Sequence, residues 1–217
     1  MATIAYVFDA YGTLFDVHSA VARHAADVGP NAARLSEIWR NKQLEYSWTR
    51  NAMNRYRDFW TLTEEALDFA LAAVPDSNTK TRSALLDAYR SLDCYPEVPG
   101  VLSRLKEKNA RLAILSNGSP EMLGSAVRSA GIGHLLDDVF SVHALARYKT
   151  APETYGLVTV AYEIQPHEVS FQSSNRWDVA GATAFGFHCN WINRSNQPEE
   201  YRDLPPVTVL KDLNGLE

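Results

Sequence analysis

The sequence contains little cysteine, no long hydrophobic run and no cluster of basic residues. Cys94 and Cys189 are its two cysteines, so we expect a reducing compartment and no disulfide framework. No apolar stretch approaches the roughly 18 residues of a membrane-spanning helix, and no leader-like basic segment precedes the first apolar run. A net charge of −5 without a basic patch disfavours nucleic-acid binding. We therefore predict a soluble, cytoplasmic protein that binds neither membranes nor nucleic acids.

The chain is rich instead in short apolar runs that alternate with segments of helical spacing. Such runs are typical of strands buried on both faces of a sheet. They are found at Ile4–Phe8, Leu112–Leu115, Val139–Val142, Val169–Phe171, Asn190–Ile192 and Val207–Leu210. Between two of them, Met122, Leu123, Ala126 and Val127 recur at the spacing of one helical face. This alternation predicts an α/β fold, with a Rossmann-like parallel sheet and helices on both faces.

One long stretch after the first run has no strand-like pattern. Its apolar residues, among them Leu35, Ile38 and Trp39, are spaced as in helices. A turn-rich segment around Pro99, a residue suited to the first turn of a helix, then returns the chain to the alternating pattern. The predicted domains are an α/β core of residues 1–14 and 95–217 and a helical cap subdomain of residues 15–94.

Polar residues follow several of the predicted strands. Asp9 follows the first strand, the pair Ser116–Asn117 follows the second, and Lys149 follows the third. A further polar cluster, Ser173–Asp178, follows the fourth. Taken one at a time, such residues are ordinary turn, cap or surface residues. Because ligands bind beyond the carboxyl ends of parallel strands, their shared position predicts one polar site with Asp9 as the candidate nucleophile.

The motifs at these positions resemble those of the haloacid dehalogenase superfamily. Residues 9–16 (DAYGTLFD) resemble its nucleophile loop, residues 115–118 (LSNG) its second motif, and residues 148–152 (YKTAP) its third. Residues 173–178 (SSNRWD) resemble its fourth motif, and residues 39–46 (WRNKQLEY) resemble the cap helix that carries an essential arginine. The motifs occur in order and at family spacing over nearly the whole chain. Within the superfamily, the chain resembles the L-2-haloacid dehalogenases.

Tyr11 stands where phosphatases of this superfamily carry a second aspartate, which protonates an alkoxide leaving group. A halide leaves as a stable anion and needs no such proton. The change also removes an acidic group from a site that would otherwise hold Mg²⁺ through several oxygen ligands, and Asp178 has no adjacent aspartate. Phosphoryl transfer without a metal or an acid has little to stabilise its charge. We therefore expect halide displacement without a metal or any other cofactor.

The resemblance implies hydrolytic dehalogenation of short-chain (S)-2-haloalkanoic acids to (R)-2-hydroxyalkanoic acids. Asp9, ionised at neutral pH, would displace the halide from C2 with inversion and form an aspartyl ester. Lys149 would orient this carboxylate and hold its charge. Asp178, set by Asn175 and Ser173, would then help a water molecule hydrolyse the ester.

The same resemblance implies three overlapping sets of site residues. Ser116, with main-chain amides near Tyr11 and Asn117, would bind the substrate carboxylate, and Arg40 would reach down from the cap to receive the halide. The implied catalytic residues are Asp9, Thr13, Arg40, Ser116, Lys149, Tyr155, Ser173, Asn175 and Asp178. The implied substrate contacts are Tyr11, Leu44, Phe59, Ser116, Asn117 and Trp177. The implied halide contacts are Arg40, Asn117 and Trp177.

Four positions depart from what this resemblance leads us to expect. Thr150 and His188 stand where proline is usual, Asn41 replaces a glutamine, and Arg176 replaces a small residue. We expect the Arg176 side chain to point outward and His188 to be a packing or surface residue. Phe59 fits an ordinary core position as well as it fits a substrate wall.

Three other functions stay open on the sequence alone. A phosphatase on the same fold would release phosphate from sugar phosphates in the presence of Mg²⁺. A ring-opening hydrolase of a non-halogenated carboxylate would use Asp9 without releasing halide. A binding protein without activity would be expected to carry broken motifs, and every motif position is filled here. Because related proteins are usually homodimers, we also expect a homodimer; the preferred halogen and chain length do not follow from the sequence.

Overall fold

A parallel β-sheet forms the centre of the molecule in the computed structural model, which describes residues 3–216. Within these residues the sheet has six strands in the order β3-β2-β1-β4-β5-β6, and every neighbouring pair is parallel. The strands are β1 (Ala5–Phe8), β2 (Arg111–Ser116), β3 (Asp138–Ser141), β4 (Val169–Ser173), β5 (His188–Ile192) and β6 (Thr208–Leu210). The predicted α/β fold is confirmed, and the last predicted strand lies at the edge of the sheet.

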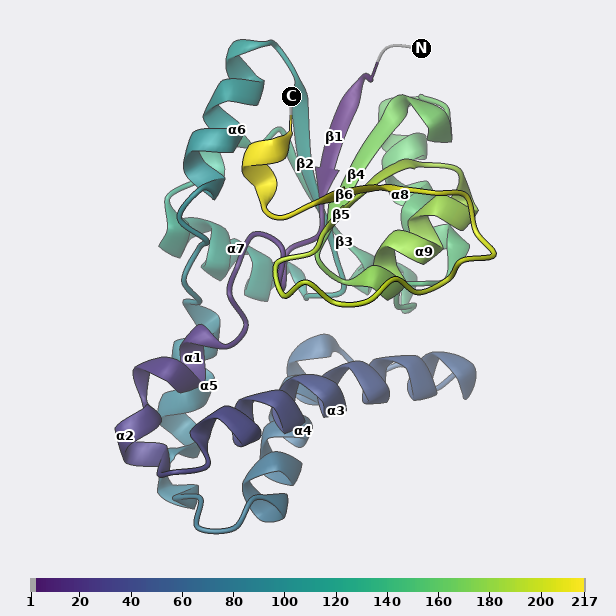
Figure 1. The fold of residues 1–217 in the computed structure, drawn as a ribbon. Helices are drawn as coiled ribbons and strands as arrows, with labels where there is room; N and C mark the ends of the chain where they lie inside the picture. Colours follow the sequence, from purple (N-terminus) through teal and green to yellow (C-terminus); the bar gives the residue numbers. More distant parts are fainter. Residues whose placement is uncertain (1–2, 217) are drawn as a thin grey trace.

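Helices cover both faces of this sheet, as the alternating pattern predicts. Figure 1 shows α6 (Val98–Glu107) and α7 (Pro120–Ala130) on one side of the sheet. It shows α8 (Pro152–Tyr162) and α9 (Arg176–Phe185) on the other side. The apolar face of α7, from Met122 to Val127, is buried. Central strands such as β1 are therefore covered by apolar side chains on both faces, which explains their nearly continuous apolar sequence.

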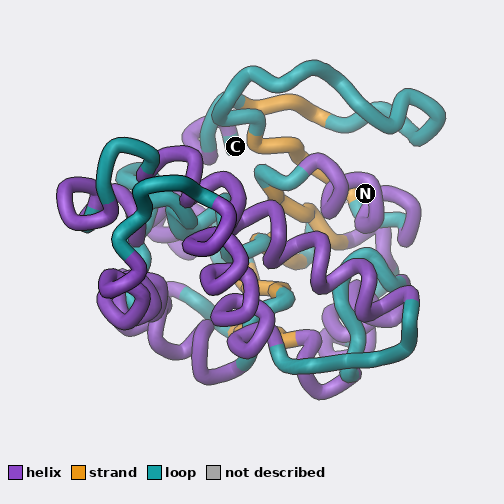
Figure 2. The backbone as a smooth tube through the Cα atoms, turned by 90° about the horizontal axis from the view of Figure 1, so that it is seen from below, coloured by secondary structure: helices purple, strands orange, loops and turns teal. Residues whose placement is uncertain are grey.

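Five α-helices lie in the long stretch between β1 and α6. They are α1 (Ser19–Arg23), α2 (Ala25–Val28), α3 (Ala32–Ala52), α4 (Phe59–Ala73) and α5 (Arg82–Arg90). Figure 1 shows them beyond the end of the sheet where β1 leads into residue 9, and in Figure 2 they lie in front of the strands. The longest, α3, packs along α4, where the Trp39 indole donates a hydrogen bond to the Thr63 carbonyl (2.8 Å).

The segments that enter and leave these helices run side by side. Phe15 and Cys94 form an isolated antiparallel bridge, flanked by hydrogen bonds from Asp16 N to the Asp93 carbonyl (2.8 Å) and from Tyr95 N to the Leu14 carbonyl (3.0 Å). Residues 1, 2 and 217 of the predicted core lie outside the described residues. Within residues 3–216 no helix is both long and apolar enough to cross a membrane.

Two glycines shape the carboxyl ends of β1 and β2, one by its backbone conformation and the other by the space that it leaves. Gly12 has a φ of +93°, a conformation that residues with a Cβ rarely adopt. A Cβ atom at Gly118 would lie 2.7 Å from a ring carbon of Tyr11, so a larger residue there would displace the ring. These turns bring the residues after β1 and β2 against each other and face them toward α3.

Candidate active site

The site is built around a buried lysine that lies between two buried carboxylates. Lys149 Nζ is 3.2 Å from Asp9 Oδ1 and 2.7 Å from Asp178 Oδ2. Asp9 directly follows β1, Lys149 lies in the segment before α8, and Asp178 lies in the first turn of α9. All three side chains are at most 7% exposed. Buried charges of this kind require a close partner, and each of the three has one.

Burial and mutual charge set the protonation of this cluster. Burial would lower the pKa of Lys149, but Asp178 and Asp9 outweigh it and raise that pKa, so the ammonium keeps its proton. Burial raises the pKa of Asp178 to about 6; Lys149 opposes the shift and Asp9 adds to it. The Tyr155 hydroxyl donates to Asp178 Oδ1 (2.8 Å), which fixes the carboxylate. A carboxylate with a pKa close to neutrality is suited to act as a general base.

The second oxygen of Asp9 is held by three side-chain donors. Asp9 Oδ2 accepts hydrogen bonds from Asn175 Nδ2 (2.7 Å), Thr13 Oγ1 (3.1 Å) and Ser173 Oγ (3.4 Å). Thr13 Oγ1 in turn accepts from the Ser174 amide (2.8 Å). The carboxylate of Asp9 therefore has one oxygen fixed by neutral donors and the other fixed by an ammonium group.

This arrangement corrects one prediction. We expected Asn175 and Ser173 to set Asp178, and that prediction is wrong for their side chains, which bind Asp9. The reason is the strand register, because Phe8 pairs with Gln172 and the residues that follow β4 therefore face the residue that follows β1. Asn175 contacts Asp178 through its main-chain carbonyl, which accepts the Asp178 amide hydrogen (2.9 Å).

Arg40 reaches the site from the middle of α3. Its Nη2 donates to the Tyr11 carbonyl (3.1 Å) and to Asn175 Oδ1 (3.4 Å). Since Asn175 also binds Asp9, the guanidinium lies one residue away from the candidate nucleophile. Arg40, Leu44 and Asn175 line a cavity of about 280 Å³. The position of Arg40 is thus that of a site residue and not that of an arginine on an exposed helix face.

Ser116 and Asn117, at the end of β2, are both buried and bind main-chain groups. Ser116 Oγ accepts from the Gly118 amide (3.1 Å), and Asn117 Oδ1 accepts from the Lys149 amide (2.9 Å). Asn117 therefore anchors the segment that carries the lysine.

An aromatic wall closes the site beside the nucleophile loop. The ring of Tyr11 is 6.2 Å from that of Phe59 and stacks on Tyr89 at 5.8 Å with an angle of 15°. Burial raises the pKa of Tyr11, so its hydroxyl stays neutral and adds no acidic charge beside Asp9. Trp177 lies elsewhere: its ring meets Trp48 edge to face at 5.4 Å. It lines a cavity of about 390 Å³ that also reaches Lys149, and the structure does not bring it into the cavity of Arg40.

The departures from the family pattern have different surroundings. The expectation that Arg176 points outward is wrong, because the segment of Glu200 and Tyr201 covers the side chain: its Nη2 donates to the Glu200 carbonyl (2.8 Å) and its guanidinium lies 5.4 Å from the Tyr201 ring. His188 is exposed at the start of β5, the end of the strand opposite the site, in agreement with a surface residue. The exposed Asn41 lines the cavity of Arg40.

A buried polar network behind Arg40 was not expected from the sequence. Gln43 Oε1 accepts from Arg40 Nη1 (2.8 Å), while its Nε2 donates to Thr63 Oγ1 (2.7 Å) and to the Tyr89 hydroxyl (3.1 Å). Gln43, Thr63 and Tyr89 are nearly inaccessible. The spacing of Arg40 and Gln43, three residues apart on a helix, is the one sequence signal that could have indicated the contact.

The site therefore contains two buried carboxylates, a buried ammonium group and a half-buried guanidinium group. Such an arrangement suits a reaction in which one carboxylate attacks a substrate and an anion leaves. Among residues 3–216, no group of three or more histidine, cysteine or acidic side chains is placed to hold a metal ion.

This fold and this set of strand-end residues are those of a haloacid dehalogenase-like hydrolase. The family model of that description matches residues 5–186. The structure superposes with a TM-score of 0.95 on a crystal structure of a dehalogenase that is 44% identical, over 98% of this chain and 94% of that one. The TM-score is 0.85 for the L-2-haloacid dehalogenase from Xanthobacter autotrophicus with chloropropionic acid covalently bound, 34% identical over 97% of this chain and 95% of that one.

Curated relatives agree with the solved structures. The chain is 48% identical over 213 residues to (S)-2-haloacid dehalogenase 1 of Pseudomonas sp. (strain CBS-3), covering 98% of this chain and 94% of that protein. It is 46% identical to (S)-2-haloacid dehalogenase 4A of Burkholderia cepacia, over 98% of this chain and 92% of that protein. The chain belongs to the L-2-haloacid dehalogenase family, as its motifs predicted.

Proposed function

We propose that this chain hydrolyses short-chain (S)-2-haloalkanoic acids to (R)-2-hydroxyalkanoic acids and halide through an ester on Asp9. The observation that carries the proposal is the pair of carboxylates, Asp9 and Asp178, joined by Lys149 and faced by Arg40. Relatives that are 48% and 46% identical are named (S)-2-haloacid dehalogenases. A structure 34% identical holds covalently bound chloropropionic acid, which supports a covalent intermediate.

In the first half of the reaction, the Asp9 carboxylate attacks C2 of the substrate. A bond forms between the carboxylate oxygen and C2 as the bond from C2 to the halogen breaks, with inversion at carbon. The halide departs as an anion, so no proton is supplied, which agrees with Tyr11 in place of an acid. Arg40 provides the nearby positive charge for the departing halide, and Ser116 lies at the strand end where the substrate carboxylate is proposed to bind.

In the second half, a water molecule attacks the ester carbonyl of Asp9. Asp178 takes the proton, and Lys149 stabilises the oxyanion that forms. Esterification removes the negative charge of Asp9, which had helped to raise the pKa of Asp178, so the base becomes easier to ionise when it is needed. Collapse breaks the bond between the Asp9 carbonyl carbon and the substrate oxygen. Asp178 passes the proton that it took from water to this leaving oxygen, so the hydroxy acid is released. The second proton of the water goes to solvent, and Asp9 is restored as a carboxylate with one oxygen from water.

The remaining roles follow from position. We assign residues 15–94 as the cap subdomain that delivers Arg40, and Tyr11, Leu44 and Phe59 as the wall around the alkyl group. Trp177 would contact the substrate from the side of Lys149. The homodimer, the cytoplasmic location and independence from metals stay predictions.

Halide release tests the proposed function directly. We expect (S)-2-chloropropionate to yield chloride and (R)-lactate at the same rate with and without excess chelator, and (R)-2-chloropropionate to yield little chloride. Asp9→Asn should abolish release, whereas Asp16→Asn, which changes a half-buried carboxylate that accepts the His18 amide hydrogen in the same loop, should not. Turnover of a strained, non-halogenated carboxylate in place of haloacids would favour the ring-opening alternative, and Mg²⁺-dependent phosphate release would favour the phosphatase.

A further inference from the structure

A side chain in the last turn of α3 binds the main chain next to Lys149 through two hydrogen bonds. Asn51 Nδ2 donates to the Tyr148 carbonyl (2.8 Å), and Asn51 Oδ1 accepts from the Tyr148 amide (3.0 Å). One side-chain amide thus binds both main-chain polar groups of the residue directly before the lysine. Such a two-point contact fixes the position and the orientation of a peptide segment more closely than one hydrogen bond does.

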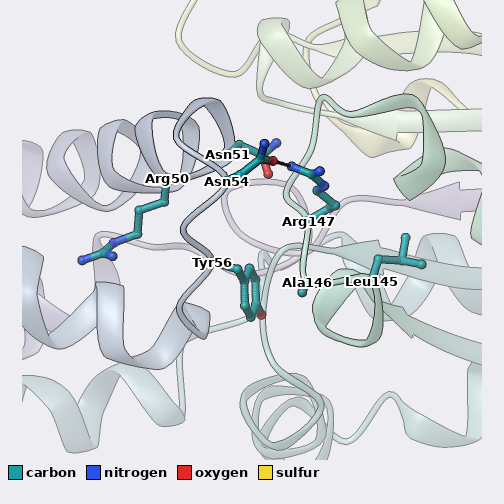
Figure 3. A pocket seen from close by; sticks show the side chains of 7 residues that line it. All are labelled: Arg50, Asn51, Asn54, Tyr56, Leu145, Ala146 and Arg147. Carbon is teal, nitrogen blue, oxygen red and sulfur yellow. Dashed lines mark hydrogen bonds between the residues drawn. The ribbon is translucent and has the colours of Figure 1, made fainter.

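Neighbouring contacts join the same two segments. Figure 3 shows Asn51 and Asn54 facing the segment of Leu145–Arg147, with a hydrogen bond between Asn54 and Arg147, around a pocket of about 350 Å³. The Tyr148 hydroxyl also donates to the Arg57 carbonyl, and its fully buried ring lies 5.8 Å from that of Phe59. The segment before Lys149 is therefore held mainly by residues that belong to the helical stretch, across the gap between the two parts of the chain.

On the opposite side, Lys149 is held by the core. Its main-chain amide donates to Asn117 Oδ1 (2.9 Å), and its ammonium lies 3.2 Å and 2.7 Å from the two carboxylates. A lysine side chain has four rotatable bonds and loses about 2 kcal/mol of rotamer entropy when it is fixed. The ammonium group can therefore contact both carboxylates at once only if the main chain of Lys149 is held in the right place.

We propose that Asn51 is a positioning residue for Lys149, so that docking of α3 on the core places two cations in the site, Arg40 directly and Lys149 through the Tyr148 peptide. The inference rests on the proposed role of Lys149. It adds a second task to α3, which supplies Arg40 from its middle and holds the lysine segment with its end.

Loss of the two hydrogen bonds from Asn51 should raise the pKa of Asp178, which would not happen if Asn51 only stabilised the fold. The titratable and charged groups around Asp178 are Lys149, Asp9, the neutral hydroxyl of Tyr155, the thiol of Cys189 and, across Asn175, the guanidinium of Arg40. Lys149 is the one that lowers the pKa of Asp178 most. A lysine that is held less closely would lower it less, so Asp178 would need a higher pH to ionise.

The test compares Asn51→Leu and Asn51→Ala with Arg147→Gln. The control removes the neighbouring hydrogen bond to Asn54 and leaves the Tyr148 peptide held. For both Asn51 variants we expect kcat to fall about 10- to 100-fold, since small misplacements cost about that much, with a smaller change in KM. In the Asn51 variants the acid limb of the pH profile of kcat should move to higher pH. The kcat and the pH profile of Arg147→Gln should match those of the wild type. Circular dichroism verifies that each variant is folded.

An unchanged acid limb and kcat in either folded Asn51 variant would overturn the proposal, and so would an equal change in Arg147→Gln. Infrared titration of the carboxyl group of Asp178, identified by its absence in Asp178→Asn, gives a readout that does not depend on activity. An upward shift in the Asn51 variants supports the positioning role even if the wild type released no halide from any haloacid. The proposed function and this inference therefore fail separately.

Discussion

The core and the helical stretch contribute to one site in different ways. The core supplies Asp9 and Asp178, whose contacts are numerous and set by neighbouring strand ends: four side-chain donors at 2.7–3.4 Å hold the carboxylate of Asp9. The helical stretch supplies Arg40, which is half-buried and makes two bonds to core groups, at 3.1 and 3.4 Å, and it holds Lys149 through Asn51. The comparison indicates that the nucleophile and base are built into the core, whereas the cations depend on how α3 is docked.

The largest expected effect is on the core side. Asp178→Asn should leave ester formation intact and slow ester hydrolysis, because the side chain keeps its shape but cannot accept the proton of water. Loss of a general base costs roughly 10²- to 10⁴-fold. We expect a burst of halide equivalent to the enzyme, followed by slow turnover, and intact-protein mass spectrometry should detect the ester. Full steady-state turnover without accumulated ester would show that Asp178 is not the base.

The next largest effect is expected for Arg40, the side chain that α3 contributes to the site. Arg40→Met keeps an unbranched apolar stem and removes the guanidinium, with its charge and its bonds to Tyr11 and Asn175. We expect kcat/KM to fall about 10²-fold or more, as expected for loss of one charged stabilising group, with the stronger loss for chloride than for bromide, the better leaving group. Arg34→Met, an exposed arginine on the same helix, should behave as the wild type. Equal rates in both variants would remove Arg40 from the site.

A smaller effect is expected for the network behind Arg40. Gln43→Leu removes the acceptor of Arg40 and leaves Thr63 and Tyr89 without their shared partner. Unsatisfied buried groups cost about 1–3 kcal/mol of stability, and a looser arginine should reduce kcat/KM about 10-fold. Thermal unfolding and steady-state kinetics measure the two effects. Glu45→Gln, an exposed change two residues away, is the matched control and should alter neither.

The smallest effect is the dependence on pH near neutrality. Because Asp178 acts in ester hydrolysis, its ionisation should appear in kcat and not in kcat/KM. The pKa of Asp178 is raised to about 6 in the free protein, and the ester removes the Asp9 charge that adds to this shift. We therefore expect kcat to fall below about pH 6, approaching tenfold per pH unit, while kcat/KM keeps no such limb from Asp178. The free energy of unfolding changes in the opposite direction to the activity. Because the folded protein binds this proton more tightly than the unfolded chain does, the contribution of Asp178 to stability falls as the pH rises from about 4 to about 6. In Asp178→Asn this part of the pH dependence of unfolding should vanish.

Much of the core was predictable because it depends on local patterns. Short apolar runs predicted the strands, and the rule that parallel strands end together predicted that Asp9, Lys149 and Asp178 meet. The targets of Ser173 and Asn175 were predicted wrongly, because they depend on the register between β1 and β4. The cavity that Trp177 lines was not predictable either, because it depends on the direction of one side chain in the first turn of α9.

The contributions of α3 were harder to predict. Arg40 was identified by resemblance to a motif, and its periodicity alone fits an exposed helix face. Asn51 and Tyr148 are 97 residues apart in the sequence, and Gln43 and Tyr89 are 46 apart. Contacts at such separations depend on how the helices dock, and no local pattern in the chain encodes them.

The most direct test of the ester on Asp9 is a single turnover in ¹⁸O-water with enzyme in excess over (S)-2-chloropropionate. Water attacks the carbonyl of the ester, so the label should enter the carboxyl group of Asp9, and the first lactate released should contain none. Mass spectrometry of the peptide that contains Asp9 and of the lactate measures both. Label found at once in the lactate, with an unlabelled Asp9, would mean that water attacks the substrate directly and would contradict the account.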